Sequence, residues 1–220
     1  MAALLLGLAL ATRSPLLDVD RIVVTGTERT PVAVVLETSG IKPGDPMTDI
    51  DVAAATTRIE RLPWVADATV RRRWPARVMV AITERVPAAT LPAPGGGWAL
   101  VDGVGRVLEH GPEQPPGLPV LAGLPPAGAP GEAVADDAGN AVAVAAALPK
   151  SLVERVATIE AGEGTLRMTL RPHGAVELGG LDLLEQKLLA VLAVLEEVAP
   201  DEFDNLDVRV PSAPVLTPRA

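Results

Sequence analysis

The sequence predicts an α+β protein, with a small βααββ domain followed by a β-rich domain in which two helices pack on a mostly antiparallel sheet. Three observations predict it. Strand and helix patterns mix within the first 85 residues, short apolar runs and turns replace them after Pro87, and 220 residues exceed the usual single-domain size. We place the domains at residues 15–86 and 87–211, with a membrane-helix stub at 1–14 and a flexible tail at 212–220.

The first domain is predicted element by element. Residues 18–25 alternate and are β-branched, which is typical of a strand ended by Gly26, and residues 31–37 suit a short helix with Thr30 as its N-cap. Asp51 can cap a helix that runs to residue 61. Residues 65–73 and 77–85 alternate as two further strands. We therefore expect two helices on one face of a three-stranded sheet, with Trp64 and Trp74 packed on the core or the sheet.

The second domain has weaker local signals. Runs on either side of Asp102-Gly103 predict a hairpin, and the Pro/Gly-rich residues 111–131 indicate an extended surface loop. Helices are predicted at 137–148 and 181–199, with strands at 153–160, 165–171 and 175–178 between them. Residues 206–210 predict the last strand, which would be an edge of the sheet, and the tail beyond Pro211 should be loosely ordered.

Composition excludes several classes of function. The chain has 19 basic and 28 acidic side chains, and this net charge of −9 repels phosphate and argues against general nucleic-acid binding. Cysteine is absent, which removes thiol nucleophiles, zinc–thiolate sites, iron–sulfur ligation and disulfides.

Catalytic motifs are equally missing. Gly95-Gly96-Gly97 lacks the Lys-Ser/Thr of a phosphate loop, no serine lies in a Gly-x-Ser-x-Gly elbow, and His110 and His173 fall in turns. The acidic pairs, such as Asp136-Asp137, lie at helix ends, where carboxylates usually face water. We expect no enzymatic activity, cofactor or metal; a secreted enzyme is an alternative that only the acidic pairs support.

Two features point to a membrane. Residues 1–12 form an uncharged apolar run that would span about 18 Å as a helix, against roughly 30 Å for a bilayer core. We interpret it as a transmembrane helix cut short at its N-terminal side; a signal peptide or a buried helix is the alternative. Arg71, Arg72 and Arg73 are either solvated strand charges or contacts for anionic lipid head groups near this anchor.

A resemblance follows from a specific block of residues: Leu62-Pro63-Trp64-Val65, Ala68, Val70, Arg73-Trp74-Pro75, Val80 and Glu84-Arg85-Val86-Pro87-Ala88. The block resembles the FtsQ/DivIB family of bacterial cell-division proteins. Further matches occur in the family's order at Ser14-Pro15, Val24-Thr25-Gly26, Gly40, Gly44, Leu100-Val101-Asp102, Gly105, Leu118-Pro119, Leu121, Gly123, Leu178-Gly179, Lys187 and Leu206-Asp207-Val208-Arg209-Val210-Pro211. The resemblance implies one membrane helix, a polypeptide-transport-associated (POTRA) domain and a β-rich domain outside the cytoplasm.

The resemblance also implies a role. Such proteins act as non-enzymatic scaffolds at the septum that link early division proteins to FtsB- and FtsL-type partners, with other divisome proteins reached through the POTRA domain. We expect the FtsB-type contact by β-strand addition to the last strand. The expected contact residues are Phe203, Asp204, Asn205, Leu206, Asp207, Val208, Arg209 and Val210. The competing interpretation is a POTRA-type chaperone module for outer-membrane protein assembly or secretion.

Overall fold

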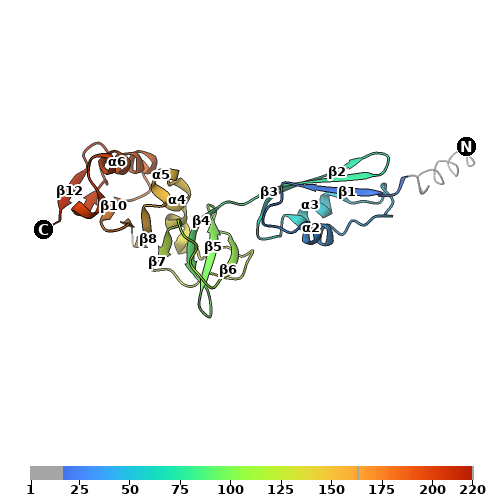
Figure 1. Ribbon diagram of the computed structural model, residues 1–220, viewed down its shortest axis with the longest axis horizontal. Coiled ribbons are helices and arrows are strands. Elements are labelled where there is room, and N and C mark those ends of the chain that lie inside the picture. Colours follow the sequence, from blue (N-terminus) through green and yellow to red (C-terminus); the bar gives the residue numbers. More distant parts are fainter. Residues whose placement is uncertain (1–16, 163, 220) are drawn as a thin grey trace, which may run out of the picture. The chain divides into compact units, whose positions relative to one another are not determined.

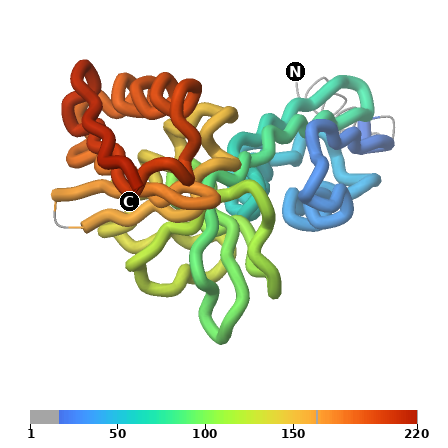
Figure 2. The backbone as a smooth tube through the Cα atoms, turned by 60° about the vertical axis from the view of Figure 1, so that its left-hand side comes forward, coloured from blue at the N-terminus to red at the C-terminus, as the bar shows by residue number. Residues whose placement is uncertain are grey.

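A computed structural model describes residues 17–162 and 164–219. The chain forms two compact units, passes once from the first to the second, and changes unit between Arg85 and Val86 (Figure 2). Helices and sheets are mixed in both units, so the α+β prediction is confirmed. The membrane stub predicted at residues 1–14 lies outside the described residues. Within the described part of the chain, no helix combines the length and apolar character that crossing a bilayer requires.

The first unit has the predicted βααββ order (Figure 1). It comprises β1 (Arg21–Thr25), α2 (Val32–Ser39), α3 (Val52–Ile59), β2 (Val65–Arg73) and β3 (Arg77–Glu84). The sheet order is β1-β3-β2, with β1 parallel and β2 antiparallel to the central β3. The alternation of β3 buries Val78, Val80 and Ile82 beneath the two helices and leaves the opposite face of the sheet to solvent.

One helix cap is as predicted and the other is not. The side chain of Asp51 accepts the N–H of Ala54 at 2.9 Å and caps α3. Thr30 does not cap α2; instead the Glu84 carboxylate, at the end of β3, accepts the N–H of Thr30 at 2.7 Å and that of Arg29 at 2.9 Å. Burial raises the pKa of Glu84, but these hydrogen bonds outweigh it and leave the pKa below its usual value. Glu84 therefore connects the residues just before α2 to the sheet through hydrogen bonds.

Replacing Glu84 by Ala should lower the stability of the first unit by about 1–3 kcal/mol, because two charge-assisted hydrogen bonds are lost and two N–H groups need new partners. Hydrogen exchange, followed separately for peptides of each unit, measures the change. Glu37→Ala is the matched control, since Glu37 is an exposed carboxylate of α2. Equal losses in the two variants would contradict the role given to Glu84.

The second unit is built on one nine-stranded sheet in the order β12-β11-β10-β9-β8-β7-β4-β5-β6. Five of its eight strand pairs are antiparallel, as the predicted mostly antiparallel sheet requires. The strands are β4 (Pro87–Pro92), β5 (Trp98–Asp102), β6 (Val107–Gly111), β7 (Val120–Ala122), β8 (Val156–Gly162), β9 (Thr165–Leu170), β10 (Ala175–Gly179), β11 (Phe203–Asp207) and β12 (Val215–Pro218).

Two helices pack on this sheet as predicted, α4 (Gly139–Ala147) and α6 (Leu184–Glu197), and a short α5 (Lys150–Val153) adds to them. Because α5 occupies residues 150–153, the strand predicted from residue 153 starts only at Val156. Helix α6 also buries Lys187, whose Nζ donates to the Gly180 carbonyl at 2.9 Å and lies 3.2 Å from Asp182 Oδ2.

The prediction of a surface loop at residues 111–131 is wrong in its middle. There β7 pairs in parallel with both β4 and β8, and Leu121 is fully buried. This three-residue strand joins the β4–β6 part of the sheet to the β8–β12 part. Its parallel partners lie far away in sequence, so no local pattern marks it.

The predicted flexible tail at residues 212–220 is also wrong, because Val215–Pro218 forms β12, antiparallel to β11. The last strand of the sheet is therefore β12. The strand predicted at residues 206–210 runs from Phe203 to Asp207 instead and is an interior strand. The boundary between chain segments near Pro211 is a turn, in which Ala213 N–H reaches the Val210 carbonyl.

Candidate partner-binding edge

The eight residues expected to contact a partner differ widely in exposure. Phe203, Leu206 and Val208 are fully buried and belong to the core of the second unit. Asp204 is exposed and 3.3 Å from His173 Nε2, and Val210 is exposed beyond the end of β11. The structure thus brings these residues together, but as the inner support of the sheet rather than as its edge.

Asp207 and Arg209, expected to supply charge to a partner, are engaged with each other. Arg209 Nη2 donates to Asp207 Oδ2 at 2.6 Å, and Arg209 Nε lies 2.9 Å from the same oxygen. The Arg209 side chain lowers the pKa of Asp207 through these hydrogen bonds, and Asp207 raises the pKa of Arg209. The pair closes the turn after β11, so its charges are largely satisfied within the chain.

The pairing of β11 shows which backbone groups are already used. Val208 donates its N–H to the Glu177 carbonyl of β10 at 3.0 Å, so by strand alternation the N–H groups of Asn205 and Asp207 face β12. The partners of these two residues in the register are Thr217 and Val215. At the end of β12, Arg219 N–H reaches the Glu202 carbonyl at 3.0 Å, which gives the same alternation. Val215 and Thr217 therefore bond to β11.

The outward-facing residues of β12 are consequently Leu216 and Pro218. Proline has no N–H, so this edge presents two carbonyl acceptors and only one donor, the N–H of Leu216. The Leu216 side chain lies over the buried core beside Leu206, while the side chains of Val215 and Thr217 are exposed. The outer edge of β12 is the feature that sequence reasoning missed. Its signal was the short run Val215-Leu216-Thr217, with a β-branched residue on either side of Leu216, between two prolines, a composition typical of an edge strand.

The opposite margin of the same sheet is bonded at the start of β6. Val107 of β6 donates to the Glu132 carbonyl at 2.9 Å and accepts from Gly131 N–H at 2.8 Å, and Arg106 forms a bridge with Ala133. Among the residues that the structure describes, no backbone bond reaches the outer side of β12. The nine-stranded sheet thus has one margin that is bonded where β6 starts, and one open margin, at β12.

The two histidines make exposed contacts in the second unit. His173 and Asp204 form an exposed pair, and His110 Nε2 lies 2.9 Å from the Gly128 carbonyl in a loop contact. Within residues 17–162 and 164–219, no cluster of three or more His, Asp or Glu side chains could hold a metal ion.

The acid sensitivity of the second unit should depend in part on Asp207. Its folded pKa lies below the usual value of 3.8, so the stabilisation is fully present above pH 3.8 and is lost as pH falls through the folded pKa. We expect Asp207→Asn to be less stable than the parent chain at neutral pH and to converge with it in acid. Unfolding curves at several pH values measure this, and a constant difference down to the acid transition would contradict it.

Comparison with known proteins gives information that is independent of this geometry. Residues 17–85, the first unit, match the family model described as POTRA domain, FtsQ-type. The chain is 30% identical over 212 residues to Cell division protein FtsQ of Mycobacterium leprae, which covers 96% of this chain and 59% of the relative. The chain therefore carries an FtsQ-type POTRA domain and is similar to an FtsQ protein over nearly all of its length. The FtsQ-type fold, a POTRA domain followed by a β-rich domain, is thereby confirmed.

Other FtsQ proteins match parts of the chain. That of Corynebacterium glutamicum is 34% identical over 128 residues, covering 58% of this chain and 52% of the relative. That of Anaeromyxobacter sp. is 36% identical over 120 residues, covering 54% of this chain and 40% of the relative. The chain spans about half the length of these FtsQ relatives.

Proposed function

We propose that the protein is a non-enzymatic scaffold of bacterial cell division, which binds an FtsB-type partner by accepting one of its segments as a tenth strand beside β12. The observation that carries the proposal is the open margin of the nine-stranded sheet at β12, whereas the opposite margin is bonded at the start of β6. The FtsQ-type POTRA domain and the similarity to FtsQ proteins support the role in division. The expected contact set, residues 203–210, then supports β12 from within and contributes exposed Asp204 and Val210 to the surrounding surface.

The donor pattern of β12 sets the chemistry of the partner segment. Two outward carbonyls, at Leu216 and Pro218, need N–H donors at alternate positions of the incoming strand, so that strand cannot carry proline there. Two copies of this chain that met edge to edge would supply one donor each and leave half of these carbonyls unpaired. The edge therefore favours a partner strand with free N–H groups over a second copy of this chain. Prolines on an edge strand disfavour self-association for the same reason.

The remaining roles follow from the family rather than from the geometry. An FtsL-type protein would join through the FtsB-type partner, and another division protein would bind the POTRA unit. A membrane helix including residues 1–12 would hold the protein in the cytoplasmic membrane at the septum, with the bulk of the chain outside the cytoplasm. Full-length protein localised in cells, with and without residues 1–16, tests the anchor separately from partner binding.

Site-specific cross-linking tests the edge directly. The chain has no cysteine, so Thr217→Cys on β12 and Glu109→Cys on β6 each introduce a single thiol. With a thiol-reactive FtsB-type peptide, we expect cross-linking at Cys of the Thr217 variant and not at that of the Glu109 variant. Cross-linking at the Glu109 variant alone would move the binding margin to β6.

A further inference from the structure

Three arginines stand side by side across the exposed face of the first unit's sheet. Arg21 of β1 is opposite Arg77 of β3 in the parallel register, and Arg77 is opposite Arg73 of β2 in the antiparallel register. All three are exposed. Residues directly opposite on adjacent strands project from the same face, so the three guanidinium groups share one surface. Arg71, two residues along β2, projects from that face as well.

This row is electrostatically unfavourable in the isolated chain, because like charges directly opposite on neighbouring strands repel. Among the described residues, no salt bridge involves any of the four arginines. The carboxylate that shares their face, Asp67, lies six residues from Arg73 along β2, about 20 Å away. Charged residues on an edge strand protect it from pairing with another chain, and this explains the arginines of β2, which is an edge strand. It does not explain Arg77, because β3 is the central strand.

The charge of the chain is divided unevenly between its units. Residues 17–85 contain ten basic and ten acidic side chains, whereas residues 86–220 contain eight basic and eighteen acidic ones, a formal charge of −10. The net charge of −9 therefore says nothing against anion binding by the first unit. Its arginine row is a local positive surface on a unit of zero net charge.

An exposed aromatic ring completes the surface. Trp74, at the tip of the β2–β3 hairpin, is 54% exposed, which overturns the expectation that it packs on the core or the sheet. Together with Arg21, Arg73 and Arg77 it lines an open pocket of about 420 Å³, whose one acidic lining residue is Asp20. Guanidinium groups bind phosphate oxygens in a forked geometry, and tryptophan favours the head-group level of membranes.

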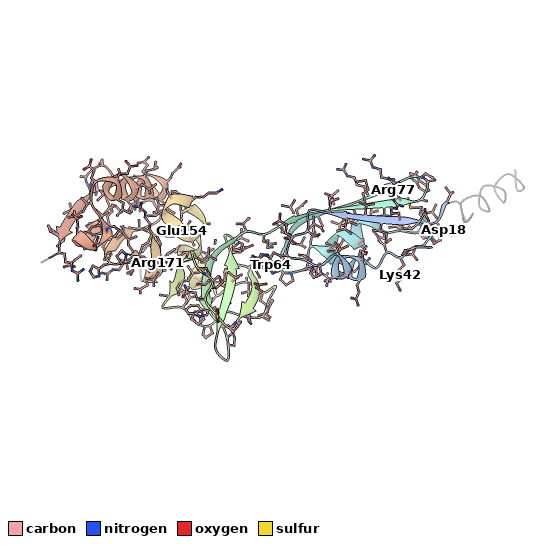
Figure 3. The ribbon with its side chains drawn as sticks, in the orientation of Figure 1. Asp18, Lys42, Trp64, Arg77, Glu154 and Arg171 are labelled. Carbon is pink, nitrogen blue, oxygen red and sulfur yellow. The ribbon has the colours of Figure 1, made fainter. Side chains whose placement is uncertain are left out.

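The hairpin tip lies beside the start of the described chain. The Ala76 carbonyl accepts the N–H groups of Asp20 and Arg21, at 2.8 and 3.2 Å. Figure 3 shows Arg77 at the same end of the first unit as Asp18, with Trp64 at the opposite end. Leu17 is four residues from Arg21, at most about 14 Å even in extended chain, and the apolar run at residues 1–12 precedes it.

We propose that the face formed by Arg21, Arg71, Arg73, Arg77 and Trp74 docks on the anionic phospholipid head groups of the membrane. The arginines bind lipid phosphates and Trp74 enters the interface. The inference takes its geometry from the membrane attachment proposed above, but its chemistry does not depend on partner binding. Contact with the membrane would hold the POTRA unit in one orientation on the surface.

A single fluorescent label in the full chain tests this docking. Ala76→Cys places an environment-sensitive dye beside the tip, and Ala66→Cys places the same dye near the opposite end of β2. With vesicles of equal parts phosphatidylcholine and phosphatidylglycerol, we expect the emission of the dye to shift to shorter wavelength when it is attached at the tip and not when it is attached at the other end. Pure phosphatidylcholine vesicles, or inorganic phosphate alone, should give no shift. A shift with phosphate alone would identify a soluble anion site and overturn the proposal.

Substitutions then distinguish membrane binding by this face from membrane binding by the apolar run at residues 1–12, which is unchanged in every variant. Arg21→Gln, Arg73→Gln and Arg77→Gln together should abolish the shift and weaken partitioning into the anionic vesicles about fivefold per arginine. Lysine at the same three positions should retain most of the dye's shift and most of the partitioning. Lys150→Gln, Arg155→Gln and Arg219→Gln, exposed on the second unit, are the charge-matched control and should change neither signal. If the triple glutamine variant does not fold, the single variant Arg73→Gln is measured in its place, with a smaller loss expected. Unchanged shifts in both glutamine variants of the row would overturn the proposal.

Discussion

Leu216→Pro should weaken binding of an FtsB-type segment by at least about tenfold, because it removes the only N–H donor on the outer edge of β12. The partner carbonyl that this N–H would satisfy is left without a donor at the interface, and the proline ring stands in its place. Contacts with β11 remain, since these run through Val215 and Thr217. Titration calorimetry or fluorescence anisotropy with the partner segment gives the affinity.

Leu216→Ala is the control for that change, because it loses the same side-chain packing and keeps the N–H. We expect it to bind within a few-fold of the parent chain. If the alanine and proline variants lose affinity equally, the side chain rather than the backbone edge carries the interaction. If both bind as the parent chain does, the partner docks elsewhere.

Phe203→Ala should destabilise the second unit by about 3–5 kcal/mol, since the only phenylalanine of the chain is fully buried. The lost ring leaves a cavity beside the close approach of Gly174, where even an added Cβ would lie 2.9 Å from the ring. Denaturant unfolding, read by hydrogen exchange in second-unit peptides, measures the loss.

Val210→Ala is the comparison from the same segment, because Val210 is 58% exposed. We expect it to leave stability within about 0.5 kcal/mol of the parent chain. A contact role for Phe203 would instead show as lost binding in a variant of unchanged stability, which would contradict its place in the core.

Features that local chemistry determines could be predicted from the sequence. Asp51 caps α3 because an acidic side chain can reach an N–H three residues on, and the strands of the first unit follow from alternation alone. The contact that holds the chain just before α2 could not be predicted, because the Glu84 carboxylate comes from 54 residues away. Thr30 was the local candidate, and it donates its own N–H to that distant carboxylate instead.

The edge of the second unit's sheet was predicted one strand too early for a similar reason. Residues 206–208 carry the stronger apolar signal because Leu206 and Val208 are buried, while β12 is short, begins after Pro214 and ends at Pro218, which makes it resemble a loose tail. Likewise β7 is hidden in the Pro/Gly-rich stretch, since its three residues gain stability only from the distant β4 and β8. The arginines were visible in the sequence, but only the register shows that three of them form a row.

Hydrogen exchange at single-amide resolution tests the central claim most directly. In the free chain, the N–H groups of Asn205 and Asp207 bond within the sheet and should exchange slowly, whereas the N–H of Leu216 faces outward and should exchange fast. On addition of an FtsB-type segment, we predict strong protection of the Leu216 N–H and little change at Asn205 and Asp207. New protection confined to β6, or a Leu216 N–H that exchanges equally fast with and without partner, would contradict strand addition at β12.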